Sequence, residues 1–94
     1  MPHANSTPKR FVGLDIHKEY LVAIGVNQQM EQVFGPQKVS IYKLEAWIRK
    51  HLNRKDAVVL EMTTNAYAVH DALEPYVHSV TVVHPPHVAL IVRA

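Results

Sequence analysis

The spacing of the apolar residues changes once along the chain, and this change constrains the fold more than any other feature. Before Ser40, the apolar residues form three short runs separated by polar turns, at 11–16, 20–26 and 31–39. Runs of this length that are rich in Val, Ile and Tyr are typical of β-strands. After Ser40 the apolar positions have the spacing of one face of an amphipathic helix: Ile41, Leu44, Trp47, Ile48 and Leu52. The sequence therefore predicts three consecutive strands and then a helix, which begins at the N-cap Ser40 and ends near Asn53.

Strands and helices alternate in the rest of the chain. A short apolar strand is expected at 57–61, followed by a helix that ends by Glu74, because Pro75 disfavours helical geometry at the residue before it. A fifth strand is expected at 77–83, and residues 87–94 are typical of the first turns of a further helix. Candidate caps for the middle helix are Thr63, Thr64 and Asn65. Alternation of this kind predicts parallel strands joined by right-handed crossovers.

The predicted order is β-β-β-α-β-α-β-(α), with the third helix truncated by the end of the sequence. This order resembles the ribonuclease-H-like superfold of the α/β class, a mixed five-stranded sheet in which the first strand is central and parallel to the fourth. The Gly35-Pro36 pair inside the third strand predicts an edge position or a bulge, because proline cannot donate to a central ladder.

The composition limits the class of protein. With 94 residues the chain is at most one domain, and we expect residues 10–94 to form it after a disordered lead-in at 1–9. The absence of cysteine excludes a disulfide scaffold and a thiolate zinc site. No apolar run approaches the ~18 residues of a membrane-spanning helix, and the N-terminus has no signal-peptide core. The sequence thus favours a soluble cytoplasmic domain or a piece of a larger protein.

Two carboxylates lie at positions that are normally apolar. Asp15 lies inside the first strand, and Glu61 ends the strand at 57–61. If these strands are adjacent and parallel, both acids project from the carboxyl-end edge of the sheet, where ligands bind in open α/β sheets. Two converging carboxylates without cysteine suit Mg²⁺ or Mn²⁺. The alternative is structural: Asp15 would cap a turn through His17 and Lys18, and Glu61 would cap the next helix.

The modest net charge of +2 conceals a basic segment at 40–55, which contains five cations and one acid. Such a cluster on a helix is one signature of a nucleic-acid partner. It is equally typical of a solvated helix face with cations near the negative C-terminal end. The candidate contacts are Arg49, Lys50, Arg54 and Lys55.

Three segments together resemble one protein family: Gly13-Leu-Asp-Ile-His-Lys18, Leu60-Glu-Met-Thr-Thr-Asn-Ala-Tyr67 and Val82-Val-His-Pro-Pro-His-Val88. They are similar to the N-terminal, RuvC-like domain of the insertion-sequence-110 transposases and the related pilin-gene invertases, the DEDD recombinases. Two local departures are His84-Pro85, where the family usually has Asn-Pro, and Met62, where a small residue is usual.

The resemblance implies a chemistry and a set of partners. Asp15 matches the first catalytic acid and Glu61 the second, and the remaining D-x-x-D pair would lie beyond residue 94. The implied activity is DNA strand cleavage and exchange in the transposition of a bacterial insertion sequence, assisted by Mg²⁺ or Mn²⁺. The implied partners are DNA, a structured guide RNA and further copies of the chain. Because half of the acidic set is missing, we expect the 94-residue chain to be inactive by itself.

Several other residues have two interpretations. His17 and Lys18 are candidate contacts to a metal or a phosphate, or simply residues of a turn. His84 and His87, with His78 nearby, allow a zinc hypothesis, although a loop role is favoured because two prolines intervene. Tyr67 could face the site or pack in the core, and Trp47 at helical spacing is expected in the core.

Two competing function classes remain at this point. A phosphotransferase of the actin and sugar-kinase type shares the superfold, but it needs a glycine-bearing phosphate loop where this chain has His17-Lys18-Glu19-Tyr20. A non-catalytic module that binds nucleic acid or a sister subunit is the other class, since fold alone does not imply function.

Overall fold

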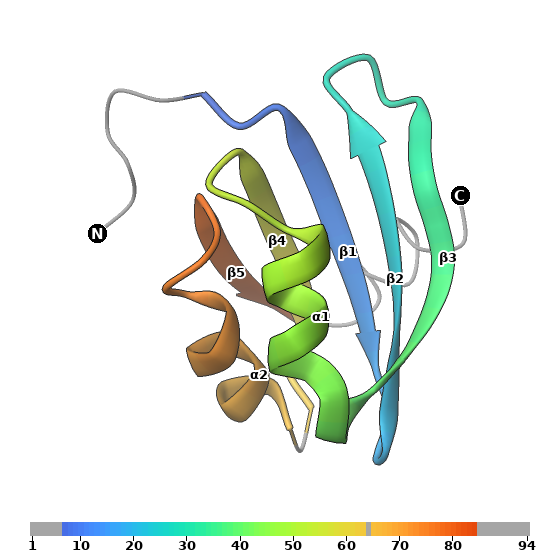
Figure 1. Cartoon of the computed structure of the whole chain (residues 1–94), viewed down its shortest axis with the longest axis vertical. Helices are drawn as coiled ribbons and strands as arrows, with labels where there is room; N and C mark the ends of the chain where they lie inside the picture. The colour runs from blue at the N-terminus through green and yellow to red at the C-terminus, as the bar shows by residue number, and fades with distance from the viewer. Residues whose placement is uncertain (1–6, 64, 85–94) are drawn as a thin grey trace.

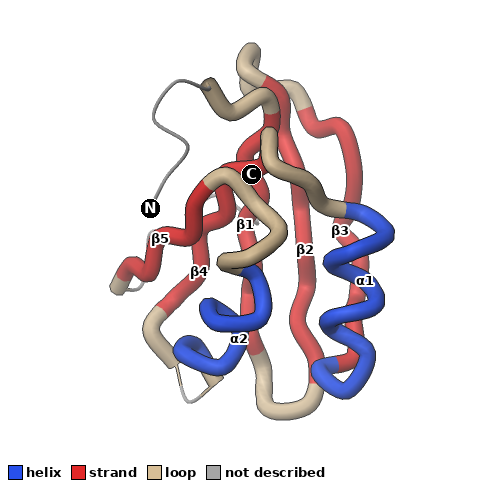
Figure 2. The backbone as a smooth tube through the Cα atoms, turned by 60° about the vertical axis from the view of Figure 1, so that its left-hand side comes forward, coloured by secondary structure: helices blue, strands red, loops and turns tan. Residues whose placement is uncertain are grey.

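A computed structural model describes residues 7–63 and 65–84, which form a five-stranded mixed sheet with two helices on one of its faces (Figure 1; Figure 2). The strands are β1 (Arg10–Ile16), β2 (Tyr20–Asn27), β3 (Gln32–Ser40), β4 (Asp56–Glu61) and β5 (Ser79–Val83). The helices are a 3₁₀ turn η1 (Ile41–Lys43), α1 (Leu44–His51) and α2 (Ala66–Leu73). The strand order across the sheet is β3-β2-β1-β4-β5.

The sheet is antiparallel in its first half and parallel in its second. β2 runs antiparallel to β1 and to β3, whereas β4 runs parallel to β1 and β5 runs parallel to β4. The predicted meander and the predicted parallel half are therefore both confirmed. β1 is central, and the three parallel strands β1, β4 and β5 end at the same edge of the sheet, which we call the carboxyl rim. β1 and β4 begin at the opposite edge, the amino rim.

The core lies between the sheet and the two helices. Alternate residues of the central strands, including Val12, Leu14, Val58 and Leu60, are fully or almost fully buried on the helix-bearing face. They pack with the apolar sides of α1 and α2, which contribute Leu44, Trp47, Ile48, Ala66, Val69 and Leu73. Trp47 is 8% exposed, so the expectation that it is a core residue is confirmed. The other face of the sheet, which carries Gly13, Asp15, Val59 and Glu61, receives no helix from the described residues.

Element boundaries follow the sequence pattern closely, with four differences. Ser40 caps the 3₁₀ turn η1, where its hydroxyl accepts a hydrogen bond from the Tyr42 backbone at 3.3 Å, but α1 itself begins only at Leu44 and has no side-chain cap. The helix then ends at His51 instead of Asn53, because Leu52 adopts an extended conformation. β5 begins at Ser79, two residues later than expected. Pro8 and Lys9, assigned to the disordered lead-in, are held by hydrogen bonds to the Gln28 side chain and the Lys55 carbonyl.

Two predictions concern segments about which the structure gives little. Most of the lead-in and the predicted helix at 87–94 lie outside the described residues.

The predicted bulge in β3 is confirmed, since the β2–β3 register shifts around Gly25 and β3 is an edge strand. At the shift, Gly35 has φ +85°, and a Cβ there would collide with the backbone of Ala23. Glycine is required at this position for both reasons.

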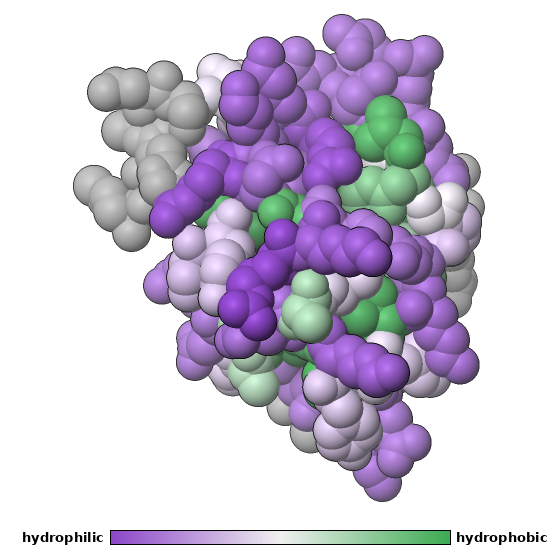
Figure 3. Space-filling model, in the orientation of Figure 1, coloured by the Kyte–Doolittle hydropathy of each residue, from purple (hydrophilic) through white to green (hydrophobic). Residues whose placement is uncertain are grey.

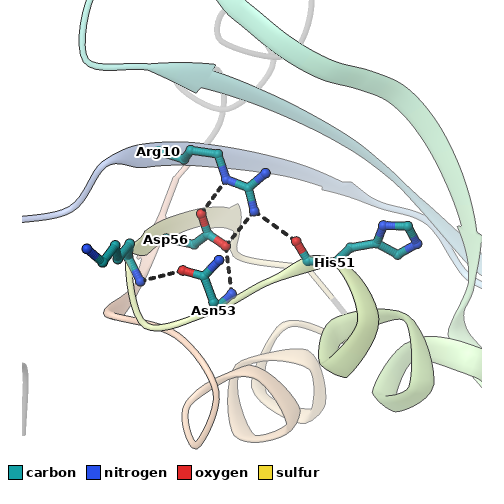
Figure 4. A network of polar contacts seen from close by, with 5 residues as sticks. Arg10, His51, Asn53 and Asp56 are labelled. Carbon is teal, nitrogen blue, oxygen red and sulfur yellow. Dashed lines mark hydrogen bonds and ion pairs between the residues drawn. The ribbon is translucent and has the colours of Figure 1, made fainter.

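A partly buried ion pair joins the start of β1 to the start of β4 (Figure 4). Asp56 is fully buried, and both of its oxygens accept from the Arg10 guanidinium, at 2.7 and 2.8 Å. Arg10 also donates to the His51 carbonyl at the end of α1, and Asp56 accepts from the Asn53 backbone at 2.8 Å. The hydrogen bond to Asp56 raises the pKa of Arg10, against the lowering effect of burial. This network fastens β1, β4 and the end of α1 together at the amino rim.

The helix-bearing surface is mostly hydrophilic, with small and separated apolar patches (Figure 3). Neither of the helices in the described part of the chain combines the length and the apolar character that crossing a membrane would require.

Candidate functional site

Asp15 and Glu61 lie side by side at the carboxyl rim. In the parallel β1–β4 ladder, Gly13 pairs with Val59 and Leu14 with Leu60, so the next residue of each strand is Asp15 and Glu61 respectively. Side chains alternate between faces along a strand, and adjacent strands are ~4.8 Å apart. Both carboxylates therefore project from the same face at the same level of the sheet. The predicted adjacency of the two acids follows from this register.

The pair belongs to a row of residues that crosses the sheet on its helix-free face. Lys38 pairs with Val22, Val22 with Asp15, and Glu61 with Val83. The row thus places a cation at one end, two acids in the centre and an apolar residue at the other end. Its centre is accessible, since the Asp15 side chain is 38% exposed.

Asp15 is the first member of a chain of contacts that leads to Lys38. Its Oδ2 lies 3.2 Å from Nε2 of His17, and the His17 ring stacks on Tyr20 with 4.6 Å between the ring centroids. The Lys38 ammonium lies over the Tyr20 ring, 4.3 Å from its centroid. Sequence reasoning missed Tyr20 and Lys38. Strand alternation alone places both residues on this face, but their meeting depends on the β2–β3 register.

The structural alternative for the two acids is only partly compatible with this geometry. Asp15 does contact His17, as a turn-stabilising role requires. Glu61 is not a helix cap, because α2 begins five residues later and Asn65 occupies its N-cap position. The Asn65 side chain instead donates across to the Lys18 carbonyl at 3.1 Å, which ties the start of α2 to the turn after β1.

The donors at this rim are suited to a cation that keeps most of its water. Within residues 7–63 and 65–84, no three His, Cys, Asp or Glu side chains gather closely enough to enclose a metal ion. A complete protein cage is therefore not formed by these residues. Mg²⁺, however, is commonly held by one or two carboxylates, with water and substrate phosphate as its other ligands. Asp15 and Glu61 fit that second kind of site.

The basic residues lie away from the acids. Arg49 and Lys50 are in the last turn of α1, whereas Arg54 and Lys55 are in the turn that follows it and not on the helix. That turn is at the amino rim, where the Lys55 carbonyl accepts from the Arg10 backbone. The seven residues of β1 separate the two rims by about 20 Å at ~3.3 Å per residue. Arg49 is paired with Glu45 at 3.6 Å.

The remaining candidates have clear positions. His78 precedes β5 and His84 follows it, so the strand separates them by about 16–20 Å, too far to share a zinc ion, while His87 lies outside the described residues. Tyr67 is 66% exposed on α2, so the core interpretation of this residue is wrong. His17 and Lys18 lie in the turn between β1 and β2, directly after Asp15.

The arrangement at the carboxyl rim is thus a pair of accessible carboxylates, flanked by an imidazole, a stacked tyrosine and an ammonium group. Such a set can bind a divalent cation and place a phosphate ester against it. The chain matches no protein-family model, no curated protein and no solved structure.

Proposed function

We propose that this chain is the N-terminal catalytic domain of a DEDD-type DNA transposase or site-specific recombinase, with Asp15 and Glu61 as two of its catalytic acids. The observation that carries the proposal is the position of these carboxylates on neighbouring parallel strands, on one face and at the carboxyl rim. Asp15 belongs to the block Gly13–Lys18, which resembles the first motif of that family.

The topology supports a ribonuclease-H-like fold as the scaffold. An order of β3-β2-β1-β4-β5, with an antiparallel meander before two parallel strands, is the order expected of that superfold. The central position of β1 matters for function. It brings an acid from the start of the chain beside one that follows 46 residues later.

Mg²⁺ or Mn²⁺ is the proposed cofactor, held by Asp15 and Glu61. When bound, a divalent ion of this kind activates water and stabilises the leaving oxygen in phosphodiester cleavage. The contact from His17 to Asp15 restrains the carboxylate, and Lys18 in the same turn supplies a positive charge for a phosphate. DNA is the proposed substrate, and the guide RNA and homo-oligomer implied by the resemblance belong to the same proposal.

The turn after β1 argues against a phosphotransferase of the actin or sugar-kinase type. His17, Lys18 and Glu19 form a tight hairpin closed by a hydrogen bond from the His17 backbone to the Tyr20 carbonyl at 2.8 Å. No glycine is present in it, and so short a turn cannot wrap a polyphosphate with backbone N–H groups.

The proposal is tested by titrating Mn²⁺ into ¹⁵N-labelled protein. We expect paramagnetic broadening to be concentrated on the amides of residues 13–17 and 60–62, and to be lost in the double variant Asp15→Asn/Glu61→Gln. Asp71→Asn is the matched control, because Asp71 is an exposed acid on α2 that contacts only its neighbour His70 in the ion pairs of the described residues. Its broadening pattern should equal that of the unmodified protein.

Uniform broadening over all exposed acids would contradict the site. So would metal-dependent DNA nicking that persists in Asp15→Ala, since the carboxylate would then have no part in the reaction.

A further inference from the structure

A cavity of about 530 Å³ lies at the carboxyl rim, beside the turn that follows Asp15. Three separate segments line it: the turn at 16–19, Tyr42 of η1, and Thr63 with Asn65 before α2. We call this cavity the rim pocket. His17 belongs to the pocket and also contacts Asp15, although neither acid lines the pocket.

The walls of the rim pocket are fastened to one another without a ligand. The Ile41 backbone, next to Tyr42, donates to the Glu19 carbonyl at 3.0 Å, and Asn65 donates to the Lys18 carbonyl at 3.1 Å. The turn therefore holds both other segments in place. Preorganisation of this kind lowers the entropic cost of binding.

Two side chains of the pocket lack an evident structural role. Tyr42 is 83% exposed, so its ring is open to a ligand. The Thr63 hydroxyl is buried but has no hydrogen-bond partner among the described residues. A buried polar group without a partner is costly and calls for an explanation. A ligand could cover Tyr42 with a flat ring, and a rotation of the Thr63 side chain would turn its hydroxyl toward the ligand's polar edge.

The other lining groups narrow the class of ligand. Lys18 supplies a cation for a phosphate, and the Glu19 carboxylate is an acceptor for an exocyclic amino group. A planar base joined to a phosphate has this combination of features. The volume is also within the ~300–1,000 Å³ that is usual for small-ligand sites.

We propose that the rim pocket receives one unpaired nucleotide of a nucleic-acid strand, its base stacked on Tyr42 and its polar edge toward Thr63. This inference rests on the proposed function, because it supplies the strand that the acids would act on. It assigns to the protein a preference for a strand with an unstacked base at the turn that follows Asp15.

The test measures fluorescence anisotropy of a labelled single strand of about 12 nucleotides, a length that exceeds one binding site, and of the blunt duplex of the same sequence. All measurements are made in EDTA, so that no metal contributes. We expect the single strand to bind more tightly than the duplex. Tyr42→Leu should weaken single-strand binding about tenfold, the order expected for loss of one stacked base, whereas Tyr42→Phe should retain it.

Tyr67→Leu is the matched control, since Tyr67 is also exposed at this end of the molecule but does not line the pocket. Its affinity should equal that of the unmodified protein. Thr63→Val should weaken binding without lowering Tm, because it removes a hydroxyl that has no partner in the free protein. Unchanged affinity in Tyr42→Leu, an equal loss in Tyr67→Leu, or equally tight duplex binding would overturn the inference.

The outcome is separate from that of the Mn²⁺ titration. If the anisotropy results are as expected but no Mn²⁺ binds at Asp15 and Glu61, the nucleotide pocket is supported and the proposed catalytic function is contradicted. The reverse result retains the metal site and removes the pocket.

Discussion

At the scale of single residues, the chain contains two kinds of buried or half-buried acid. Asp56 is fully buried, and its charge is balanced by Arg10 and by the Asn53 backbone. Asp15 is partly exposed and its nearest partner is a histidine. A paired, inaccessible carboxylate stabilises the fold, whereas an accessible one beside a second acid is available to a ligand.

Removal of the Asp56 carboxylate should be among the most damaging single changes. Asp56→Ala leaves the half-buried Arg10 guanidinium and the Asn53 backbone N–H without their partner, so we expect a loss of about 3 kcal/mol in the free energy of unfolding. The double variant Arg10→Met/Asp56→Leu removes both charges and should lose less. Urea unfolding measures both, and an equally large loss in the double variant would show that the uncompensated charge is not the cause.

The contribution of Arg10 to the free energy of unfolding should fall only at strongly alkaline pH. Asp56 raises the pKa of Arg10 above its already high ordinary value. The stabilisation from Arg10 is then fully present below the pKa of the unfolded state and is lost only as pH rises through the folded value. The difference in stability between the unmodified protein and Arg10→Met should therefore stay constant from about pH 7 to pH 10, as far as the guanidinium determines it.

At the scale of elements, α1 is shorter than its pattern suggested, and the basic segment is divided by its end. Lys50 lies on the helix, Arg54 and Lys55 lie in the turn to β4, and Arg49 forms an ion pair within the helix. The segment at 40–55 is thus no single helical stripe. Its cations lie along α1 and at the amino rim, about 20 Å from the acids. This separation corresponds to roughly six base pairs of duplex DNA at ~3.4 Å each.

The salt dependence of DNA binding tests whether these cations contact phosphates. Lys50→Gln/Arg54→Gln/Lys55→Gln should reduce the slope of log K against log salt by about 2 to 3, since each phosphate contact contributes ~0.9 for duplex DNA. Lys43→Gln/Asp71→Asn is the control, because it removes one charge of each sign outside the candidate contacts and leaves the net charge unchanged. If the slope does not change in the triple variant, these cations form only a solvated surface.

At the scale of the whole molecule, β1 organises both rims. Among the five strands of the described residues, it alone pairs with an antiparallel neighbour on one side and a parallel neighbour on the other. Its first residue, Arg10, is part of the ion pair with Asp56, and its sixth residue, Asp15, lies beside Glu61. The strand therefore couples the stability of the amino rim to the geometry of the carboxyl rim.

Amide hydrogen exchange should be slowest in the central strands β1 and β4 and faster in the edge strand β5. The central positions of β1 and β4, such as Leu14 and Leu60, are fully buried and should exchange only through global unfolding. β5 is a five-residue edge strand with only partly buried residues, so its amides should exchange by local opening and faster. Protection in β5 equal to that in β1 would contradict this order.

Much of this structure was predictable from local spacing. The apolar periodicity indicated all five strands and both helices of the described region, and Trp47 had the core role expected from its position. Asp15 and Glu61 stood out because a carboxylate at an apolar strand position is unusual wherever the strand is placed. The ends of elements were less predictable, since Leu52 has helical spacing but an extended backbone.

The sequence by itself determined which residues form strands and helices, and it singled out two acids at strand ends. The tertiary structure alone decided which side chains meet across the fold. The pairing of Arg10 with Asp56, the stack of His17, Tyr20 and Lys38, and the assembly of the rim pocket all join segments that are distant or in separate elements. Periodicity is a property of neighbours along the chain, whereas strand register and segment contact depend on how the whole core packs. The two acids could therefore be found in the sequence, but these contacts between segments could not.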